Sequence, residues 1–433
     1  MQALAAEHPD YVAALARHQR WNYGLNFLDS GTFALTKAAL TETTVLPYFV
    51  SQMTNNAMVI GLSPAIAWLG LYLPQLFGAY LVHSRAQRKA HIVVLAWLER
   101  ATFVGMLLIA LQIGRWPPAM VLAAFLSIYC LYWAITGLLI PPYSDFYAKH
   151  IPSGRGRFLG RQAIIYGGVG VVGAAITQRL LTRTSFPTNF VHVLAFALVS
   201  SLPALIAFHS LREVAFPVDR PQQSVGGFLR ATVPLLRAHP AFVRFVAMRA
   251  VLVFGKMSIP FLAIYALERF QMQAGVVATY TALMLAAQSL SAPLWGYLGD
   301  RWHAHRLWFV AALVQWLHTG LAFLAPSPGW FLFIFALVGV SLGAEATAHP
   351  HTTYSLSPAA ETTRFVGLAN TVLGPLLALG PLLAGALVNV FSYRAALGAS
   401  LVAATIGVVA VAAWVLRERG GVGGWTAGGV SCQ

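Results

Sequence analysis

The stretch GYLGDRWHAHR, residues 296–306, is a short charged turn between two long apolar runs, and a degenerate copy of it occurs earlier in the chain. The copy, GAYLVHSRAQR, occupies residues 78–88, which is 218 residues away and about half the chain length. A second pair of similar segments, YAKHIPSGRGRFLG from Tyr147 and YSLSPAAETTRFVG from Tyr354, repeats after 207 residues. Two copies of a membrane-embedded unit are typical of transporters whose binding site lies between the two repeats.

Composition places the chain in a lipid bilayer. Hydrophobic residues make up 58% of the 433 residues and charged residues 9%, whereas about a quarter of the residues in soluble domains are charged. The apolar residues form twelve runs near the ~20 residues that a helix needs to cross the hydrocarbon. Helices are the only plausible spans, because every backbone group must be paired within its own segment. The sequence therefore predicts an all-α membrane protein with twelve transmembrane helices in two pseudo-symmetric six-helix halves. The predicted spans are residues 24–50, 58–82, 92–112, 118–141, 159–181, 190–210, 242–266, 276–298, 307–325, 330–348, 366–388 and 395–416.

The distribution of basic residues predicts the orientation of the chain. With the N-terminus in the cytoplasm, most of the 28 Lys and Arg residues fall in cytoplasmic loops, and the even number of spans returns the C-terminus to the same side. The net charge of +15 then faces anionic membrane lipids, so nucleic acid is a poor candidate partner. We expect a monomeric multi-pass protein of the inner (plasma) membrane.

The longest connection carries prolines, glycines and basic residues and is predicted to be a cytoplasmic central loop between the halves. The N-terminal segment lacks the features of a signal peptide, and residues 1–21 have the pattern of a short amphipathic helix. Cys130 falls in a span and Cys432 in the tail, so neither a disulfide nor a thiolate metal site is indicated. The predicted divisions are an N-terminal half at 1–211, the central loop at 212–240, a C-terminal half at 241–419 and a disordered tail at 420–433.

The charged turn matches the loop signature G-x-L-x-D-R-x-G-R-R of a known family, which places it between spans two and three and often between spans eight and nine. The matching residues are Gly296, Leu298, Asp300, Arg301 and Arg306. With its twelve spans, its long central loop and its paired copies, the chain resembles the major facilitator superfamily of secondary transporters over essentially its whole length.

The resemblance implies a conformational lock at these turns. An aspartate at the end of a span can accept hydrogen bonds from the N-terminus of a neighbouring helix and pair with arginines until the halves rock. In the first-half copy Val82 occupies the aspartate position, which implies that the lock exists on one side only. The implied gating residues are Gly296, Asp300, Arg301, Arg306, Gly78, Arg88, Arg157 and Arg364.

Ionisable residues inside the spans are the strongest functional candidates, because each costs several kcal/mol in lipid unless it is paired or faces water. Lys37 and Lys256 are nearly equivalent in the two halves, at an offset of 219 residues. We interpret them, with Arg249, as substrate-binding residues: two free ammonium groups facing a central cavity would clamp an anionic group, as basic residues do in the organophosphate antiporters of the superfamily. The alternative is that Lys37 pairs with Asp29 or Glu42, and Lys256 with Glu345, in structural ion pairs.

Buried carboxylates are candidates for proton coupling. Glu345 stands in a small-residue stretch, where a carboxylate could gain and lose a proton near neutral pH; a permanent salt bridge to Arg249 or Lys256 is the competing interpretation. Asp29 is a second candidate for coupling or gating. The adjacent Glu99 and Arg100 are expected to point to different helix faces, so each needs a partner elsewhere, and we expect that role to be structural.

Patterns typical of cofactors carry little weight here. The segment GVGVVG at residues 168–173 fits a nucleotide-binding motif, but it lies inside a span without a preceding strand. His349, His351 and Glu345 are close in sequence, yet Pro350 interrupts the helix, and we do not expect a metal there. No catalytic triad pattern or Walker motif is present in the sequence, so we expect no cofactor and no enzyme activity.

The sequence therefore predicts a secondary transporter that works by alternating access, is coupled to protons or another ion, and favours a small molecule with an anionic group as its substrate. One alternative is an exporter of lipophilic or drug-like compounds, which the apolar and aromatic spans favour. Another, from a different class, is a membrane sensor or integral enzyme, which would need a sizeable extramembrane domain or a catalytic constellation.

Overall fold

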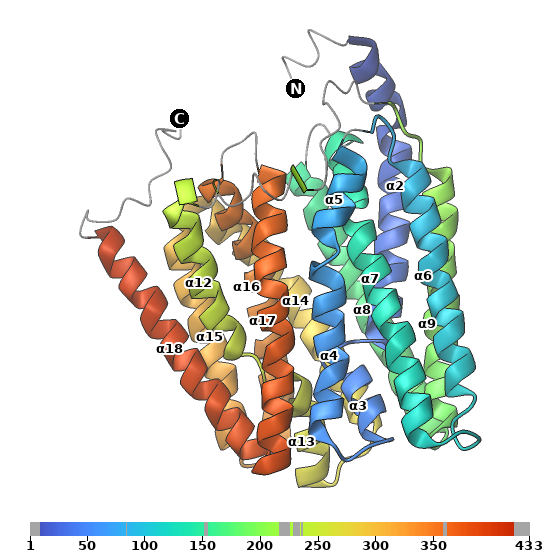
Figure 1. Cartoon of the computed structure of the whole chain (residues 1–433), viewed down its shortest axis with the longest axis vertical. Coiled ribbons are helices and arrows are strands. Elements are labelled where there is room, and N and C mark those ends of the chain that lie inside the picture. Colours follow the sequence, from blue (N-terminus) through green and yellow to red (C-terminus); the bar gives the residue numbers. More distant parts are fainter. Residues whose placement is uncertain are drawn as a thin grey trace. The chain divides into compact units, whose positions relative to one another are not determined.

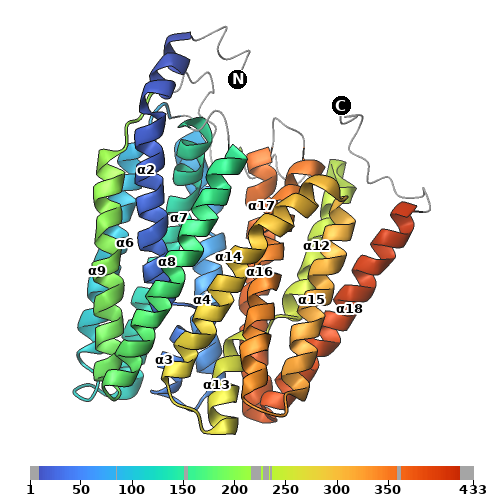
Figure 2. The same ribbon diagram turned by 180° about the vertical axis from the view of Figure 1, so that it is seen from behind.

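The computed structural model describes residues 9–83, 85–150, 155–215, 226–227, 234, 237–357 and 362–419. Over these ranges every regular element is an α-helix, and the chain divides into two compact units (Figures 1 and 2). The first unit contains residues 1–53, 66–222 and 273–282, and the second contains residues 54–65, 223–272 and 283–433. The predicted fold class, an all-α membrane protein with two six-helix halves, is confirmed.

The helices α4 and α14 contribute residues to both units. The other helices of the first unit are α2 (Pro9–Ala39), α3 (Val45–Ser51), α5 (Gln75–His83), α6 (Lys89–Ala110), α7 (Pro118–His150), α8 (Arg155–Arg183) and α9 (Thr188–Ser210). Those of the second unit are α12 (Pro240–Phe254), α13 (Ile259–Phe270), α15 (Ala304–Leu324), α16 (Gly329–Leu356), α17 (Thr362–Val390) and α18 (Tyr393–Arg419). The two shared helices are α4 (Ala57–Tyr72) and α14 (Gly275–Arg301).

Eleven spans among the described residues are long and apolar enough to cross a membrane. Two of them join a pair of helices: α4 with α5, and α12 with α13. The helix α2 is not one of the eleven, and it carries ionisable side chains such as Asp29 and Lys37 within its apolar stretch. It packs beside α8 and α9 (Figure 2), so its polar groups face protein rather than lipid.

Each unit has its own apolar core, and large apolar side chains also cover the outside. The core of the first unit includes Phe146 and Phe208, and that of the second includes Phe245 and Trp308, all buried. Leu290 is 81% exposed and several other leucine, isoleucine and valine side chains are more than half exposed. In water such a surface would promote aggregation, whereas in a bilayer it is the expected face toward lipid.

The first and seventh predicted spans are not continuous helices. The helix α2 ends at Ala39 and α3 begins at Val45, and the five residues between them are all buried. The helix α12 ends at Phe254 and α13 begins at Ile259. Proline follows each break, Pro47 in α3 and Pro260 in α13, and proline cannot donate the backbone hydrogen bond that would continue the preceding helix. The spans predicted at residues 24–50 and 242–266 are therefore each made of two helices, interrupted just before Pro47 and Pro260.

Glycines let helices of the first unit approach to backbone contact. A Cβ atom at Gly137 of α7 would lie 2.7 Å from the carbonyl oxygen of Leu71 and closer still to that of Gly70, both on α4. A Cβ atom at Gly70 would in turn lie 2.6 Å from Cβ of Trp133. The contact between α4 and α7 therefore depends on hydrogen in place of a methyl group at both positions.

We expect Gly137→Ala to destabilise the protein by about 1–3 kcal/mol, because the added methyl group must push two helix backbones apart. Gly168→Ala in α8 is the matched control, since a Cβ atom there meets nothing within 4 Å. Thermal unfolding of the two purified variants would show a lower midpoint for Gly137→Ala alone. Equal midpoints would contradict the close contact of α4 with α7.

Candidate functional site

The second unit contains a buried cluster in which one carboxylate binds two cations. Glu345 on α16 receives Arg249 from α12 at one oxygen and Lys256 from the break between α12 and α13 at the other. The side chains are 20%, 4% and 12% exposed, respectively, so all three charges are largely removed from solvent. With Glu345 ionised, the three residues together carry one positive charge.

Aromatic and polar side chains surround this cluster. The guanidinium of Arg249 lies 4.7 Å from the ring centroid of Trp308, whose indole N–H donates to the Thr352 hydroxyl at 2.9 Å. His349 follows Glu345 by one helical turn, and its Nε2 lies 3.2 Å from the side-chain oxygen of Asn370 on α17. The described residues contain no group of three or more His, Cys, Asp or Glu side chains placed to hold a metal ion.

A side chain of α15 hydrogen-bonds to the chain at the break that carries Lys256. The carbonyl oxygen of Leu252 accepts a hydrogen bond of 2.7 Å from the side-chain amide of Gln315. A Cβ atom at Gly255 would collide with that amide and lie 3.0 Å from Cα of Ala404, so glycine is what allows Gln315 to reach the chain. A side chain thus satisfies a backbone group that a continuous helix would have paired internally.

The first unit has an ion pair at its own break. Lys37, in the last turn of α2, contacts the carboxylate of Glu42, which lies in the segment between α2 and α3. The ammonium also lies 4.8 Å from the ring centroid of Trp133 on α7. In an unbroken helix, the side chains of residues five apart point to different faces. The break changes the direction of the chain, so that the Glu42 carboxylate lies beside the Lys37 ammonium.

The clamp predicted from the sequence required both ammonium groups to be free of carboxylates of their own, and this expectation was wrong. Lys37 is paired with Glu42, and Lys256 with Glu345. The offset of 219 residues identified equivalent positions in the two halves but contained no information on the breaks, which decide where the carboxylates lie. Substrate binding by Lys37, Lys256 and Arg249 stays a prediction.

Asp29 on α2 belongs to a hydrogen-bonded chain inside the first unit. Its carboxylate accepts a hydrogen bond of 2.7 Å from the hydroxyl of Tyr143 on α7, and that hydroxyl accepts one of 2.7 Å from the amide of Asn26. Asp29 is 9% exposed. Its predicted role in coupling or gating is untested, but its partners show that the carboxylate is held in a fixed orientation.

The adjacent residues Glu99 and Arg100 on α6 do contact one another, contrary to the expectation that they could not. Both side chains are long enough to bend into the same space beside the helix. Glu99 also accepts a hydrogen bond of 2.9 Å from the Thr136 hydroxyl, and Arg100 donates to the carbonyl oxygen of Ser201 at 3.2 and 3.3 Å. The pair therefore joins α6 to α7 and α9 within the first unit.

A family model described as Major Facilitator Superfamily matches residues 23–374 and 245–424. The chain belongs to this superfamily. It is a membrane transporter and not an enzyme. A search of curated proteins gave no match.

Solved structures of other transporters share the fold of this superfamily member. A peptide transporter, POT, in complex with alafosfalin is 16% identical, with a TM-score of 0.69, and the match covers 94% of this chain and 96% of that one. The nucleoside transporter NupG is 13% identical, with a TM-score of 0.66 and coverage of 91% and 99%. A D-xylose-proton symporter is 15% identical, with a TM-score of 0.63 and coverage of 92% and 97%. At these identities the likeness establishes the fold.

The loop signature of this superfamily lies where α14 ends and α15 begins. Arg301 is exposed, with its guanidinium 4.3 Å from the ring centroid of Tyr297, and Arg306 is exposed as well. The side chains of Asp300, Arg157 and Arg364 lie outside the part of the transporter that the structure describes. Their predicted gating roles therefore stay predictions, as do those of Gly296 and Gly78.

In the first-half copy of the signature, residues 78–88, Val82 occupies the aspartate position, and carboxylates from other parts of the chain contact this turn. Arg88 is 2% exposed, and its Nε donates to Asp145 of α7 at 2.6 Å. The carboxylate of Glu213, which follows α9, accepts hydrogen bonds from the backbone N–H groups of Arg88 and Lys89 at 2.6 and 2.9 Å, at the start of α6. An acidic group at a helix N-terminus is stabilising there. The sequence analysis missed both acids, because they lie 57 and 125 residues from Arg88 along the chain.

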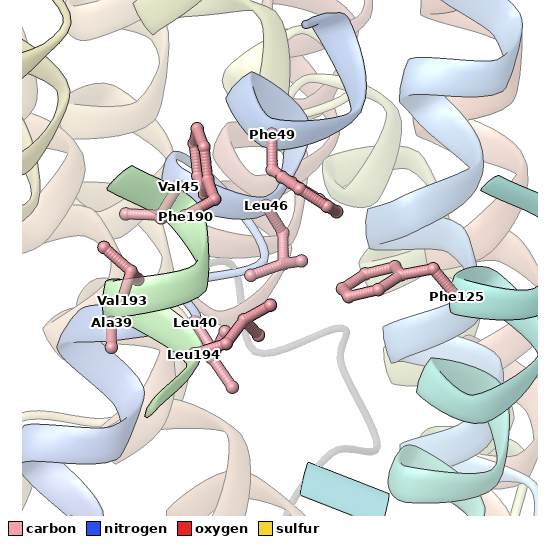
Figure 3. A pocket seen from close by; sticks show the side chains of 9 residues that line it. All are labelled: Ala39, Leu40, Val45, Leu46, Phe49, Phe125, Phe190, Val193 and Leu194. Atoms are coloured by element: carbon pink, nitrogen blue, oxygen red, sulfur yellow. The ribbon is translucent and has the colours of Figure 1, made fainter. Parts of the chain in front are cut away.

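A small apolar cavity lies beside the break in the first unit (Figure 3). About 10 Å³ of it is open to the centre of a water-sized sphere, which is at the lower limit for holding a single water molecule. The cavity therefore has no room for a transported molecule, and it lacks the polar partners that a water would need. Its lining residues are Ala39, Leu40, Val45, Leu46, Phe49, Phe125, Phe190, Val193 and Leu194.

Proposed function

We propose that this transporter carries a small molecule with an anionic group together with a proton, by alternating access, and that Arg249, Lys256 and Glu345 form the site where the two are coupled. The observation that carries the proposal is the sharing of one largely buried carboxylate, that of Glu345, between two cations. Charged residues inside membrane spans that pair with one another are typical of substrate and proton pathways.

Coupling follows from competition for the two cations. While Glu345 is ionised, its oxygens occupy Arg249 and Lys256, so an incoming anion would have to displace it. When Glu345 accepts a proton, both cations become available and the substrate anion takes the place of the carboxylate. The proton adds one positive charge and a monoanionic substrate adds one negative charge. The empty and loaded clusters therefore carry the same net charge, so binding of the substrate and the proton together buries no additional net charge.

Two further residues are proposed for supporting roles. Lys37 would contribute to substrate binding from the first unit, and Asp29 is the second candidate for a proton site because its carboxylate is buried and hydrogen-bonded. The D-xylose-proton symporter, which shares the fold, is a proton symporter by its name, and this supports proton coupling by analogy. Breaks in corresponding helices of the two halves are features that transporters use to line binding sites.

The surroundings of the transporter are also part of the proposal. The excess of basic residues supports an inner-membrane protein with both termini in the cytoplasm and with anionic lipids along its cytoplasmic loops. We propose that it works as a monomer.

Uptake into proteoliposomes tests the coupling directly. We expect a monoanionic substrate to accumulate when the pH is lower outside than inside, and we expect the initial rate to be the same with and without an imposed membrane potential, because no net charge moves. A panel of organic anions, sugars, peptides and lipophilic cations would identify the substrate class. Accumulation that depends on potential, or that ignores the pH gradient, would contradict the proposed cycle.

Export of lipophilic or drug-like compounds is the second candidate. It is favoured by the pairing of both lysines, which leaves no free ammonium pair for an anion, and by the buried aromatic side chains around Lys37 and Arg249. Proton-driven accumulation of a lipophilic cation in everted membrane vesicles, without any transport of organic anions, would establish this function in place of the first.

A further inference from the structure

We infer that two histidines of the second unit, His318 on α15 and His349 on α16, are alternative partners for the two cations of the coupling cluster. When Glu345 accepts a proton, Lys256 donates a hydrogen bond to His318 in its place. Arg249 likewise donates a hydrogen bond to His349. The inference rests on the proposed function, in which Glu345 becomes neutral, and it adds two positioning residues to the same site.

His318 lies beside the break that carries Lys256. The hydroxyl of the next residue, Thr319, reaches the carbonyl oxygen of Gly255 at 3.5 Å, and Gly255 directly precedes Lys256. The charge of Lys256 acts on the imidazole of His318. The histidine is 1% exposed, and its Nε2 has no hydrogen-bond partner among the described residues. A buried nitrogen that no contact uses therefore lies near the ammonium.

This nitrogen of His318 is the one without a proton. Nδ1 lies 3.4 Å from the hydroxyl oxygen of Thr319, and that hydroxyl donates its single proton to backbone carbonyl groups, with the oxygen of Gln315 at 2.9 Å. The hydroxyl oxygen can therefore only accept from Nδ1, so the proton of the neutral imidazole is on Nδ1. Nε2 then carries a lone pair and can only accept a hydrogen bond.

His349 has the same arrangement beside Arg249. It follows Glu345 by one turn of α16, and its ring centroid lies 6.0 Å from that of Phe245, which precedes Arg249 by one turn of α12. The charge of Arg249 acts on this imidazole. Nε2 lies 3.2 Å from the amide oxygen of Asn370, which can only accept, so Nε2 carries the proton. Nδ1 carries a lone pair and has no hydrogen-bond partner among the described residues.

The state that needs these acceptors is the protonated cluster before the substrate arrives. An ionised Glu345 satisfies both cations, but a protonated one offers them no charge, and a buried cation without a partner is strongly unfavourable. A lone pair of a neutral imidazole accepts a charge-assisted hydrogen bond without adding a charge. A proton on either imidazole would be repelled by the cation beside it, so both histidines act as acceptors and not as proton carriers.

The exchange of partners also keeps the cations ready for the substrate. An anion attracts an ammonium or a guanidinium more strongly than a neutral nitrogen does, so an arriving anion displaces His318 and His349 without having to compete with Glu345. The two histidines therefore stabilise the intermediate between proton binding and substrate binding.

A double-mutant cycle tests the inference without any substrate. Glu345→Gln keeps the cluster permanently neutral at that position, and the paired change His318→Phe with His349→Phe keeps both rings and removes the acceptors. We expect the paired change to lower the midpoint of thermal unfolding by at least about 2 °C more in Glu345→Gln than in the unmodified transporter. The hydrogen bonds to Thr319 and Asn370 are lost in both backgrounds, so their contribution cancels. Equal decreases in the two backgrounds would overturn the inference.

Two further variants separate the acceptor from the ring. In Glu345→Gln, His318→Gln with His349→Gln returns an acceptor oxygen to each position and should restore part of the lost midpoint. His192→Phe, at an exposed histidine on α9 of the first unit, is the matched control and should change the midpoint equally in both backgrounds. No restoration by the glutamines would show that packing of the rings, and not hydrogen-bond acceptance, produces the difference, and this would overturn the inference.

Nuclear magnetic resonance of the histidine nitrogens gives a second measurement that needs only Glu345→Gln to fold. In transporter labelled with ¹⁵N-histidine, the signal of a nitrogen that carries a lone pair moves when it accepts a hydrogen bond. We expect the signals of Nε2 of His318 and Nδ1 of His349, assigned by their loss in the phenylalanine variants, to move in Glu345→Gln. A histidine whose signal stays in place is not a partner, and the inference is overturned if both signals stay.

These measurements are independent of transport, so the inference and the proposed function can fail separately. If an organic anion accumulates with protons but the cycle shows no coupling and the nitrogen signals do not move, the inference is wrong and the proposed function stands. If the histidines respond to Glu345→Gln but no substrate responds to a pH gradient, the proposed coupling is wrong and the histidines stand as partners of the two cations.

Discussion

Glu345→Gln is expected to abolish accumulation driven by a pH gradient and to retain exchange of substrate across the membrane. The neutral amide resembles the protonated acid, so Arg249 and Lys256 stay available to an anion, but the side chain cannot deliver or release a proton. Proteoliposomes loaded with unlabelled substrate would measure exchange, and the same vesicles with an imposed pH gradient would measure accumulation. We expect accumulation to fall to the level of empty vesicles.

The control for this experiment is Glu268→Gln, in which the carboxylate lost lies near the end of α13 and contacts the Tyr393 hydroxyl instead of a cation in the cluster. Its accumulation should remain close to that of the unmodified transporter. If Glu345→Gln still accumulates substrate in response to the pH gradient, the coupling role moves to Asp29 or to another residue.

Arg100→Met is expected to destabilise the protein by about 3–5 kcal/mol, because it leaves the buried carboxylate of Glu99 without its cation. Glu99 is 6% exposed, and the Thr136 hydroxyl donates the remaining hydrogen bond that its carboxylate accepts from the described residues. Replacing both residues, Glu99→Leu with Arg100→Met, removes the two charges together and should destabilise the protein less than the single change. Thermal denaturation of the purified variants in detergent measures the difference in stability.

Arg115→Met serves as the control, since that side chain is exposed in the connection between α6 and α7. We expect its unfolding midpoint to match that of the unmodified protein. A double variant less stable than Arg100→Met would show that the hydrogen bonds to Thr136 and Ser201, and not the uncompensated charge, dominate the contribution of this pair.

Apolar runs predicted the spans well, because a helix that crosses the lipid needs about 20 consecutive, mainly apolar residues whatever it packs against. The sixth predicted span, residues 190–210, corresponds to α9 at Thr188–Ser210. Pro47 and Pro260 indicate interruptions of their spans, and the breaks lie just before them. The partners of the broken helix ends were not predicted. Buried helix ends depend on partners such as Gln315, which is 63 residues from the carbonyl group that it satisfies, and no local pattern reports such a contact.

Ion pairing was the least predictable part of the candidate site. The sequence identified the charged residues Lys37, Lys256, Arg249 and Glu345 as functional candidates, since charge inside a span is conspicuous. It left their partners open, because a lysine side chain can reach carboxylates on several neighbouring elements.

The polarity of α2 has a consequence for the order in which a newly synthesised chain assembles. Asp29 finds its hydrogen-bond donor on α7, Ser30 on α8, and Thr36 its partner on α9. All three helices leave the ribosome after α2 does, and α2 is not among the spans that are apolar enough to cross the membrane on that ground alone. The polar side chains of α2 are thus satisfied in the bilayer by helices that are made after it, and this packing is complete only when α9 has been inserted.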